Sequence, residues 1–223
     1  MLRKALMSWS TGKDSAWALH QLRQNPEIDL LGLFCTVSKE FNRVAMHGVR
    51  VELLQEQAES IGLPVEIIEV PYPCSNAEYD RIMGQFVERA RNNNIEYFAF
   101  GDLFLEDVRN YREEKLKGSG IEPIFPVWGI PTDKLSREMI SSGLRAVITC
   151  IDPEQTPKEF LGREFNESFL DSLPETIDPC GENGEFHSFV FAGPMFKERI
   201  EIVVGDTVHR DDFVFADVLP KSP

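Results

Sequence analysis

The sequence predicts an α/β protein in which a parallel sheet with helices on both faces precedes a smaller α+β part with antiparallel strands. Short apolar runs alternate with helical patterns through the first half of the chain, which is typical of crossover connections in a parallel sheet. The pattern changes after residues 125–133, and strand-like runs end the chain. With 223 residues, 42% of them hydrophobic, the chain is long enough to bury a substantial core.

The first half contains four expected strands separated by helical patterns. The first helical pattern stops at the Asn25-Pro26 pair, and the second stops at Gly62. Ligands of such sheets collect at the carboxyl ends of the strands. The expected strands cover residues 5–9, 28–37, 65–70 and 95–100, and the helical patterns cover residues 16–22, 51–61 and 79–90.

The second part begins with one more helix and strand, and a loop-rich acidic stretch follows through Glu182. Three strand-like runs then favour an antiparallel meander, with a turn at Gly205-Asp206. The expected elements are a helix over residues 133–141 and strands over residues 146–151, 185–191, 199–204 and 213–219.

Charge and cysteine content argue against several classes of function. The chain has 23 basic and 37 acidic side chains and a net charge of −14, which opposes broad binding to nucleic acids or anionic membranes. Its four cysteines include no C-x-x-C pair, so we expect free thiols rather than a disulfide framework or a zinc site. No stretch is typical of a signal peptide or a membrane span, and a soluble cytoplasmic protein is therefore expected.

The most informative stretch, S-T-G-K-D-S at residues 10–15, lies between the first strand and a helix expected to begin at Ser15. A helix start leaves amides unpaired, and its dipole favours anions. Gly12 lets the backbone approach a ligand closely, Lys13 adds a charge suited to phosphate, and Asp14 could orient the loop or help hold Mg²⁺. The candidate phosphate contacts are Ser10, Thr11, Gly12, Lys13, Asp14 and Ser15.

This loop differs from two common phosphate motifs. Met7 and Asp14 replace the first glycine and the Ser or Thr of G-x-x-x-x-G-K-S/T, and the loop is not G-x-G-x-x-G either. An ordinary capped turn is the alternative, since Asp14 or Ser15 would cap a helix well.

Two further candidate groups follow expected strands. His47 and Gly48 come after the second strand, where His47 could contact phosphate and Gly48 would permit a close approach; a plain helix start is the alternative. Gly101 and Asp102 end the fourth strand, where Asp102 could contact magnesium or substrate, or cap the next helix.

The loop resembles the S-G-G-K-D-S loop of the N-type ATP pyrophosphatases, which grips the β- and γ-phosphates of ATP and leaves the α-phosphate open to attack. Four further stretches, in the same order, resemble the diphthine–ammonia ligase family. They are R-V-A-M-H-G-V-R, F-G-D-L-F-L-E-D-V-R-N-Y-R-E, F-P-V-W-G and C-G-E-N-G-E-F-H-S-F-V-F-A-G-P-M-F. The resemblance spans most of the chain.

This resemblance implies a Rossmann-like, adenine nucleotide alpha hydrolase-like domain that carries ATP, expected over residues 1–127. A smaller domain over residues 128–223 would close over the substrate. The implied reaction adenylates a carboxylate with ATP, releases pyrophosphate, and forms an amide with ammonia as AMP leaves. We expect Mg²⁺ held by Asp14 and Asp102, and the adenine near residues 34–37.

Two carboxylates complete the expected site. Glu182 and Glu185 bracket Asn183-Gly184 in a sharp turn, where they could position ammonia, act as a base or hold a second metal; an acidic hairpin turn is the alternative. With Lys13 they are the expected catalytic residues. His187 is a secondary candidate or simply a strand residue.

Two departures from the family pattern bear on the substrate. Thr11 replaces the glycine at the second position of the loop, and Asn183 replaces a glycine of E-G-G-E. They favour a bacterial-type branch, whose carboxylate, on a small molecule or a protein, need not be diphthine. A regulatory module that holds ATP without consuming it is the alternative function. RNA thiolation is a weaker alternative function, because it usually needs reactive cysteines and a basic RNA-binding surface, and this sequence indicates neither. The sequence leaves a homo-oligomer open.

Overall fold

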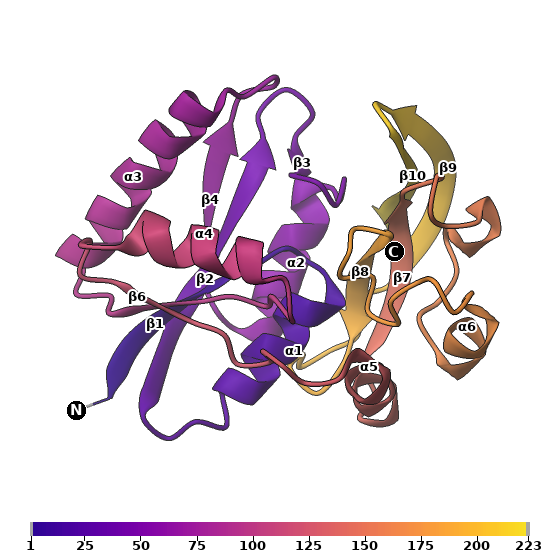
Figure 1. Cartoon of the computed structure of the whole chain (residues 1–223), viewed down its shortest axis with the longest axis horizontal. Coiled ribbons are helices and arrows are strands. Elements are labelled where there is room, and N and C mark those ends of the chain that lie inside the picture. Colours follow the sequence, from indigo (N-terminus) through magenta and orange to yellow (C-terminus); the bar gives the residue numbers. More distant parts are fainter. Residues whose placement is uncertain (1, 222–223) are drawn as a thin grey trace.

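The computed structural model describes residues 2–221, which form two sheets with helices around them (Figure 1). In the larger sheet, five parallel strands lie in the order β4–β2–β1–β5–β6, and the short β3 pairs antiparallel with β2. The strands are β1 (Arg3–Ser8), β2 (Ile28–Ser38), β3 (Arg43–Val44), β4 (Val65–Val70), β5 (Tyr97–Ala99) and β6 (Glu122–Ile124). The predicted α/β fold class is confirmed.

Helices cover both faces of this sheet, as Figure 1 shows. On one face, Phe86 of α3 packs against Phe34 and Phe98 of the sheet. On the other, Trp17 of α1 and Leu54 of α2 belong to a core that continues into the second sheet. The helices are α1 (Lys13–Leu22), α2 (Val51–Ile61), α3 (Asn76–Asn92) and α4 (Glu106–Leu116). The α1 and α2 layer is thus sandwiched between the two sheets.

The strand order reverses next to β1. From β1 the chain moves through α1 to β2 on one side, and after α3 it returns to β5 on the other. Loops at such a reversal diverge and leave a crevice beyond the carboxyl ends of the strands. The segments that leave β1 and β5 therefore flank the natural ligand position of this sheet.

The second sheet has the antiparallel order β8–β7–β10–β9. It is not the predicted meander, because β8 pairs with β7 and not with β9. The turn predicted at Gly205-Asp206 is also wrong, since β9 runs through it and the chain reverses at Asp211-Asp212. The elements are α5 (Thr132–Ser141), β7 (Arg145–Ile151), a 3₁₀ turn (Lys158–Phe160), α6 (Glu167–Ser172), β8 (Phe186–Ala192), β9 (Ile202–Arg210) and β10 (Phe213–Pro220).

Gly205 sits where the pairing of β9 with β10 shifts register. A Cβ at this position would lie 3.0 Å from the Asp217 carbonyl oxygen. A glycine inside a strand often marks such a bulge or a close backbone approach, and not a turn. This explains the wrong prediction.

Within residues 2–221, no helix has the length and apolar character needed to cross a membrane. All four cysteines are free thiols, and three of them, Cys35, Cys150 and Cys180, are buried.

Candidate functional site

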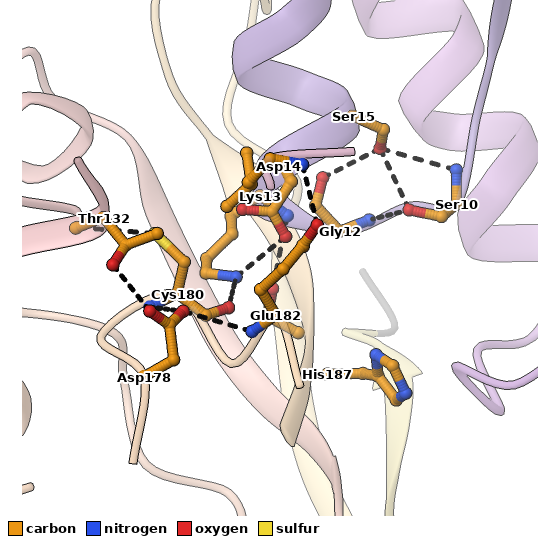
Figure 2. Close-up of polar contacts among 12 residues, drawn as sticks. Ser10, Gly12, Lys13, Asp14, Ser15, Thr132, Asp178, Cys180, Glu182 and His187 are labelled. Carbon is orange, nitrogen blue, oxygen red and sulfur yellow. Dashed lines mark hydrogen bonds and ion pairs between the residues drawn. The ribbon is translucent and has the colours of Figure 1, made fainter. Parts of the chain in front are cut away.

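The predicted phosphate loop joins β1 to α1 at the reversal point of the sheet. The Gly12 amide donates to the Ser10 hydroxyl at 3.4 Å, and that hydroxyl lies 3.1 Å from the Ser15 hydroxyl. The Ser15 hydroxyl also donates to the Gly12 carbonyl at 3.0 Å (Figure 2). The loop is therefore closed on itself. Helix α1 begins at Lys13, earlier than the predicted Ser15, and has no side-chain cap, which leaves an amide-rich helix start suited to an anion.

Helix α2 and strand β8 of the second sheet fix the loop. Thr11 has a φ of +71°, in the left-handed region that glycine normally occupies, at the position where the resembling family has glycine. Its carbonyl accepts hydrogen bonds from Gln57 Nε2 at 3.1 Å and from the Val190 amide of β8 at 3.0 Å. The Lys13 amide donates to the Ser188 hydroxyl of β8 at 3.2 Å. Strand β8 thus forms part of the loop's support.

Lys13 carries a buried positive charge at this site. Its side chain points toward the 178–182 turn, where Nζ donates to the Cys180 carbonyl oxygen and lies 2.8 Å from Asp14 Oδ2 (Figure 2). Burial by itself would lower the pKa of Lys13, but Asp14, Cys180 and Glu182 together outweigh it and raise the pKa above the usual value. Lys13 is therefore a cation at neutral pH.

The 178–182 turn is organised by Asp178, which sequence analysis missed. Asp178 Oδ2 accepts hydrogen bonds from the amides of Cys180 at 2.9 Å and Glu182 at 3.1 Å, while Oδ1 accepts one from the Thr132 hydroxyl at 2.5 Å. An aspartate that bonds the amide two residues later is a common turn device. The D-P-C-G pattern was therefore an available signal.

The two predicted glutamates occupy different environments. Glu182 lines a polar cavity and accepts a hydrogen bond from the Leu103 amide at 2.7 Å. Glu185 is 1% exposed, and its Oε1 accepts hydrogen bonds from the Asp178 amide at 2.9 Å and Asn183 Nδ2 at 3.0 Å. In the described part of the chain, Glu185 lies outside the set of residues that line this cavity and braces the turn that presents Glu182.

A cleft with two connected cavities opens beside the loop. The larger, of about 460 Å³, is lined mainly by apolar groups such as Phe34, Val44 and Phe98, together with Cys35 and Thr36. The smaller, of about 270 Å³, is more polar. Together they have the size and mixed lining of small-molecule sites. Six residues line both cavities: Ser8, Ser10, Met46, His47, Phe100 and Arg112.

The smaller cavity brings together most of the predicted site residues. Its lining includes Ser10, Lys13, Asp14, Ser15, His47, Gly101, Asp102, Glu182 and His187. Burial, and then the neighbouring Asp14 carboxylate, raise the pKa of Glu182 to about 7, whereas burial lowers the pKa of His187 to about 4. Burial and the adjacent His187 hold the pKa of His47 well below its usual value. The two imidazole rings pack with their centres 4.6 Å apart and are neutral at pH 7.

Asp14 and Asp102, the residues predicted to hold magnesium, both line the smaller cavity. Asp14 Oδ1 and Asp102 Oδ2 are buried without hydrogen-bond partners, although Oδ2 of Asp102 lies 3.5 Å from Arg112 Nε. Among residues 2–221, no three His, Cys, Asp or Glu side chains are grouped to hold a metal ion by themselves. Two free carboxylate oxygens suit Mg²⁺, which commonly takes one or two carboxylates and completes its shell with phosphate oxygens and water.

The two predicted glycines have different surroundings. A Cβ at Gly101 would lie 2.8 Å from the Ser15 amide nitrogen and 2.9 Å from the Asp14 carbonyl carbon, so Gly101 lets β5 reach the start of α1. Gly48 has a φ of +68°, and a Cβ there would lie 2.6 Å from the Phe215 ring of β10. In this structure Gly48 therefore packs against the second sheet and is not among the residues that line the smaller cavity.

Comparison with known proteins finds one family along both parts of the chain. Residues 3–123 match the description "Diphthamide synthase N-terminal domain", and residues 131–218 match "Diphthamide synthase C-terminal domain". The diphthine–ammonia ligase of Danio rerio is 29% identical over 72% of this chain and 69% of its own length. The corresponding values for the Homo sapiens protein of that name are 30%, 70% and 61%.

This chain therefore spans between three fifths and about two thirds of the length of these relatives. Among solved structures, the U34-tRNA thiolase NcsA from Methanococcus maripaludis aligns with 60% of this chain and 55% of its own, at 19% identity and a TM-score of 0.38. The matches to both family domains together cover nearly all of the sequence. This chain belongs to the diphthamide synthase family.

Proposed function

We propose that this protein is an ATP-dependent ligase, which adenylates a substrate carboxylate and then converts it to an amide with ammonia. The observation that carries the proposal is the position of the S-T-G-K-D-S loop. It starts α1 at the reversal point of the sheet and faces a cleft with one apolar and one polar cavity. Its relatives are named diphthine–ammonia ligases, which is the same reaction class.

The two cavities divide the ATP molecule between them in this proposal. The base lies in the larger cavity, where Phe34, Cys35 and Thr36 form part of the wall, in agreement with the expected adenine position. The phosphates lie at the loop, where the helix start and Lys13 offset their charge.

In the first step a carboxylate oxygen of the substrate forms a bond to the α-phosphorus, and the bond to the β-phosphate bridging oxygen breaks. Pyrophosphate leaves with that electron pair. Ammonia then attacks the acyl carbon, AMP departs, and the nitrogen loses one proton. Asp14 and Asp102 would hold Mg²⁺, which when bound supplies charge neutralisation for the phosphates. Glu182, in the polar cavity, accepts the proton from the attacking nitrogen.

Glu182→Gln is expected to lower kcat at least 100-fold and to remove a pH dependence. A carboxyl group with a pKa of about 7 is mostly protonated below pH 6 and ionised above pH 8, so kcat/KM of the unmodified protein should rise with pH through that range. Glutamine keeps the acceptor for the Leu103 amide but cannot take a proton. The exposed Glu106 of α4 provides the control, Glu106→Gln, which should keep both rate and profile. A Glu182→Gln protein with an unchanged pH profile would contradict this role.

The reaction class is tested by identifying the nucleotide product. ATP, Mg²⁺ and ¹⁵N-ammonium are incubated with either a diphthine-bearing protein or a protein-free cell extract, and a Lys13→Met protein, which lacks the cation at the loop, serves as the blank. AMP and pyrophosphate in equal amounts, with ¹⁵N in an amide, are the expected products. The two arms separate a protein carboxylate from a small-molecule carboxylate.

Formation of ADP would refute the proposal, and bound ATP that stays intact in both arms would favour the regulatory module. Glu182 distinguishes the ligase from the regulatory module better than Glu185 does. Glu185 holds the 178–185 turn through its hydrogen bonds, so a substitution there would disturb the site whether ATP is consumed or only bound. The bacterial-type branch, the cytoplasmic location and a homo-oligomer stay predictions.

A further inference from the structure

The R-V-A-M-H-G-V-R stretch has an arginine on each side of His47, and neither Arg43 nor Arg50 lines the two cavities. Arg50 binds Asp217 of β10 with two nitrogens, Nε at 3.0 Å from Oδ1 and Nη2 at 2.7 Å from Oδ2. Arg43 Nη1 lies 2.8 Å from Asp217 Oδ1 and 2.8 Å from the Gly48 carbonyl oxygen. A single aspartate of the second sheet thus ties down both ends of the 43–50 turn.

The tip of the same turn reaches the phosphate loop. A Cβ on Gly12 would lie 3.0 Å from Cε1 of His47, so the imidazole rests directly on the loop. His47 Nδ1 lies 3.5 Å from the Ser188 carbonyl oxygen, and its ring packs on His187. The turn therefore has Asp217 at its base and His47 against the loop at its tip.

We propose that Asp217 is a positioning residue: through Arg43 and Arg50 it holds the 43–50 turn so that His47 meets the phosphate loop. The consequence for turnover rests on the proposed function, but the consequence for the position of His47 does not. The second sheet would in this way set the geometry of a nucleotide site formed mainly by the first.

The ion pairs have the features of a structural clamp. The Asp217 side chain is 15% exposed and that of Arg43 is 20% exposed, so water screens their contact less than it screens a surface pair. Arg50 contributes a bidentate contact, which fixes orientation as well as distance. The two arginines lower the pKa of Asp217 to about 2, and the clamp stays ionised throughout the range in which an ATP-dependent enzyme would be assayed.

Chemical modification of histidine tests the position of His47 without any assay of turnover. Diethyl pyrocarbonate reacts with accessible neutral imidazoles, and mass spectrometry reports each histidine separately. The exposed His209 provides the internal reference. Asp217→Asn is expected to raise the modification rate of His47 relative to His209 at least fivefold and to leave His20 within twofold.

Two further variants keep this test decisive. Arg50→Gln breaks the same bidentate contact from the arginine side. The Arg50 side chain is 35% exposed, so this variant replaces Asp217→Asn in the test if Asp217→Asn does not fold. Glu52→Gln removes the other carboxylate near Arg50, at 3.6 Å, and should leave the His47 rate unchanged. Protection of His47 at the level of the unmodified protein in Asp217→Asn, or in Arg50→Gln where Asp217→Asn does not fold, would overturn the proposal.

A double-mutant cycle then tests whether Asp217 acts on turnover through His47. Asp217→Asn is expected to reduce kcat/KM for ATP 10- to 100-fold, but less than threefold when introduced into the His47→Ala protein. Equal reductions in the two backgrounds would show that Asp217 acts by another route and would overturn the proposal. If the unmodified protein has no turnover, the proposed function fails while the modification result still stands.

Discussion

Replacing Lys13 with methionine is expected to lower kcat/KM for ATP at least 1000-fold, about 4 kcal/mol of transition-state stabilisation. Lys13 Nζ is the buried cation of the polar cavity, and in a site with little water such a charge strongly stabilises a departing pyrophosphate. Methionine has a similar length and no charge. Without Lys13, the Asp14 carboxylate would also repel the phosphates.

Stability should change as well. From the sequence alone we expect Lys13→Ala to leave the fold almost intact, but the structure shows Nζ bonded to the Cys180 carbonyl oxygen. An unpaired buried acceptor costs roughly 1–3 kcal/mol, which corresponds to a melting temperature about 2–12 °C lower in a protein of this size. Calorimetry measures that shift beside the kinetics. Lys117→Met, at an exposed lysine, is the control, and a Lys13→Met protein with more than a tenth of normal kcat/KM would exclude this role.

Gly101→Ala should weaken ATP binding at least tenfold although alanine adds only one methyl group. The new carbon would lie 2.8 Å from the Ser15 amide nitrogen and 3.0 Å from the Asp14 carbonyl oxygen. Both are backbone atoms at the start of α1, so neither can turn aside, and the helix start itself has to move. The amides that hold the phosphates would move with it.

Gln85→Ala in α3 supplies the control for this change. Gln85 is exposed and lies outside both cavities, and alanine is at least as favourable as glutamine in a helix. Gln85→Ala should therefore keep the melting temperature and the ATP affinity, the latter measured by titration calorimetry. Equal ATP affinity in the Gly101→Ala and Gln85→Ala proteins would show that the chain after β5 can move away from α1 without disturbing the loop.

The parts of this fold that local patterns encode were predictable. Strand β4 was expected at residues 65–70 and observed as Val65–Val70, and α2 ends at Gly62 in the left-handed conformation that glycine accepts. Strands β3 and β6 have two and three residues, too few to give a periodic signal. The bulge at Gly205 looked like a turn because glycine serves both purposes.

The sequence was sufficient to predict which segments form the candidate site, but not the contacts between residues that lie far apart along the chain. The loop and the strand ends indicated where a ligand would lie, since their positions follow from strand order. The burial of Glu185 could not be inferred, because its partners are set by the path of the 178–185 turn. The contact of Asp217 with Arg43 and Arg50 joins residues 174 and 167 positions apart, and no local pattern reports such a pairing.

The hydrogen bonds between β8 and the phosphate loop also limit which sequences could replace the second half of this protein. Gln57 Nε2 donates to both the Thr11 and Val190 carbonyl oxygens, and Ser188 accepts from the first amide of α1. A chimaera that kept the first half and took its second half from an unrelated gene would lose these partners at once. We therefore expect the two halves to function only as a matched pair, in which a substitution in one half has to preserve the hydrogen bonds to the other.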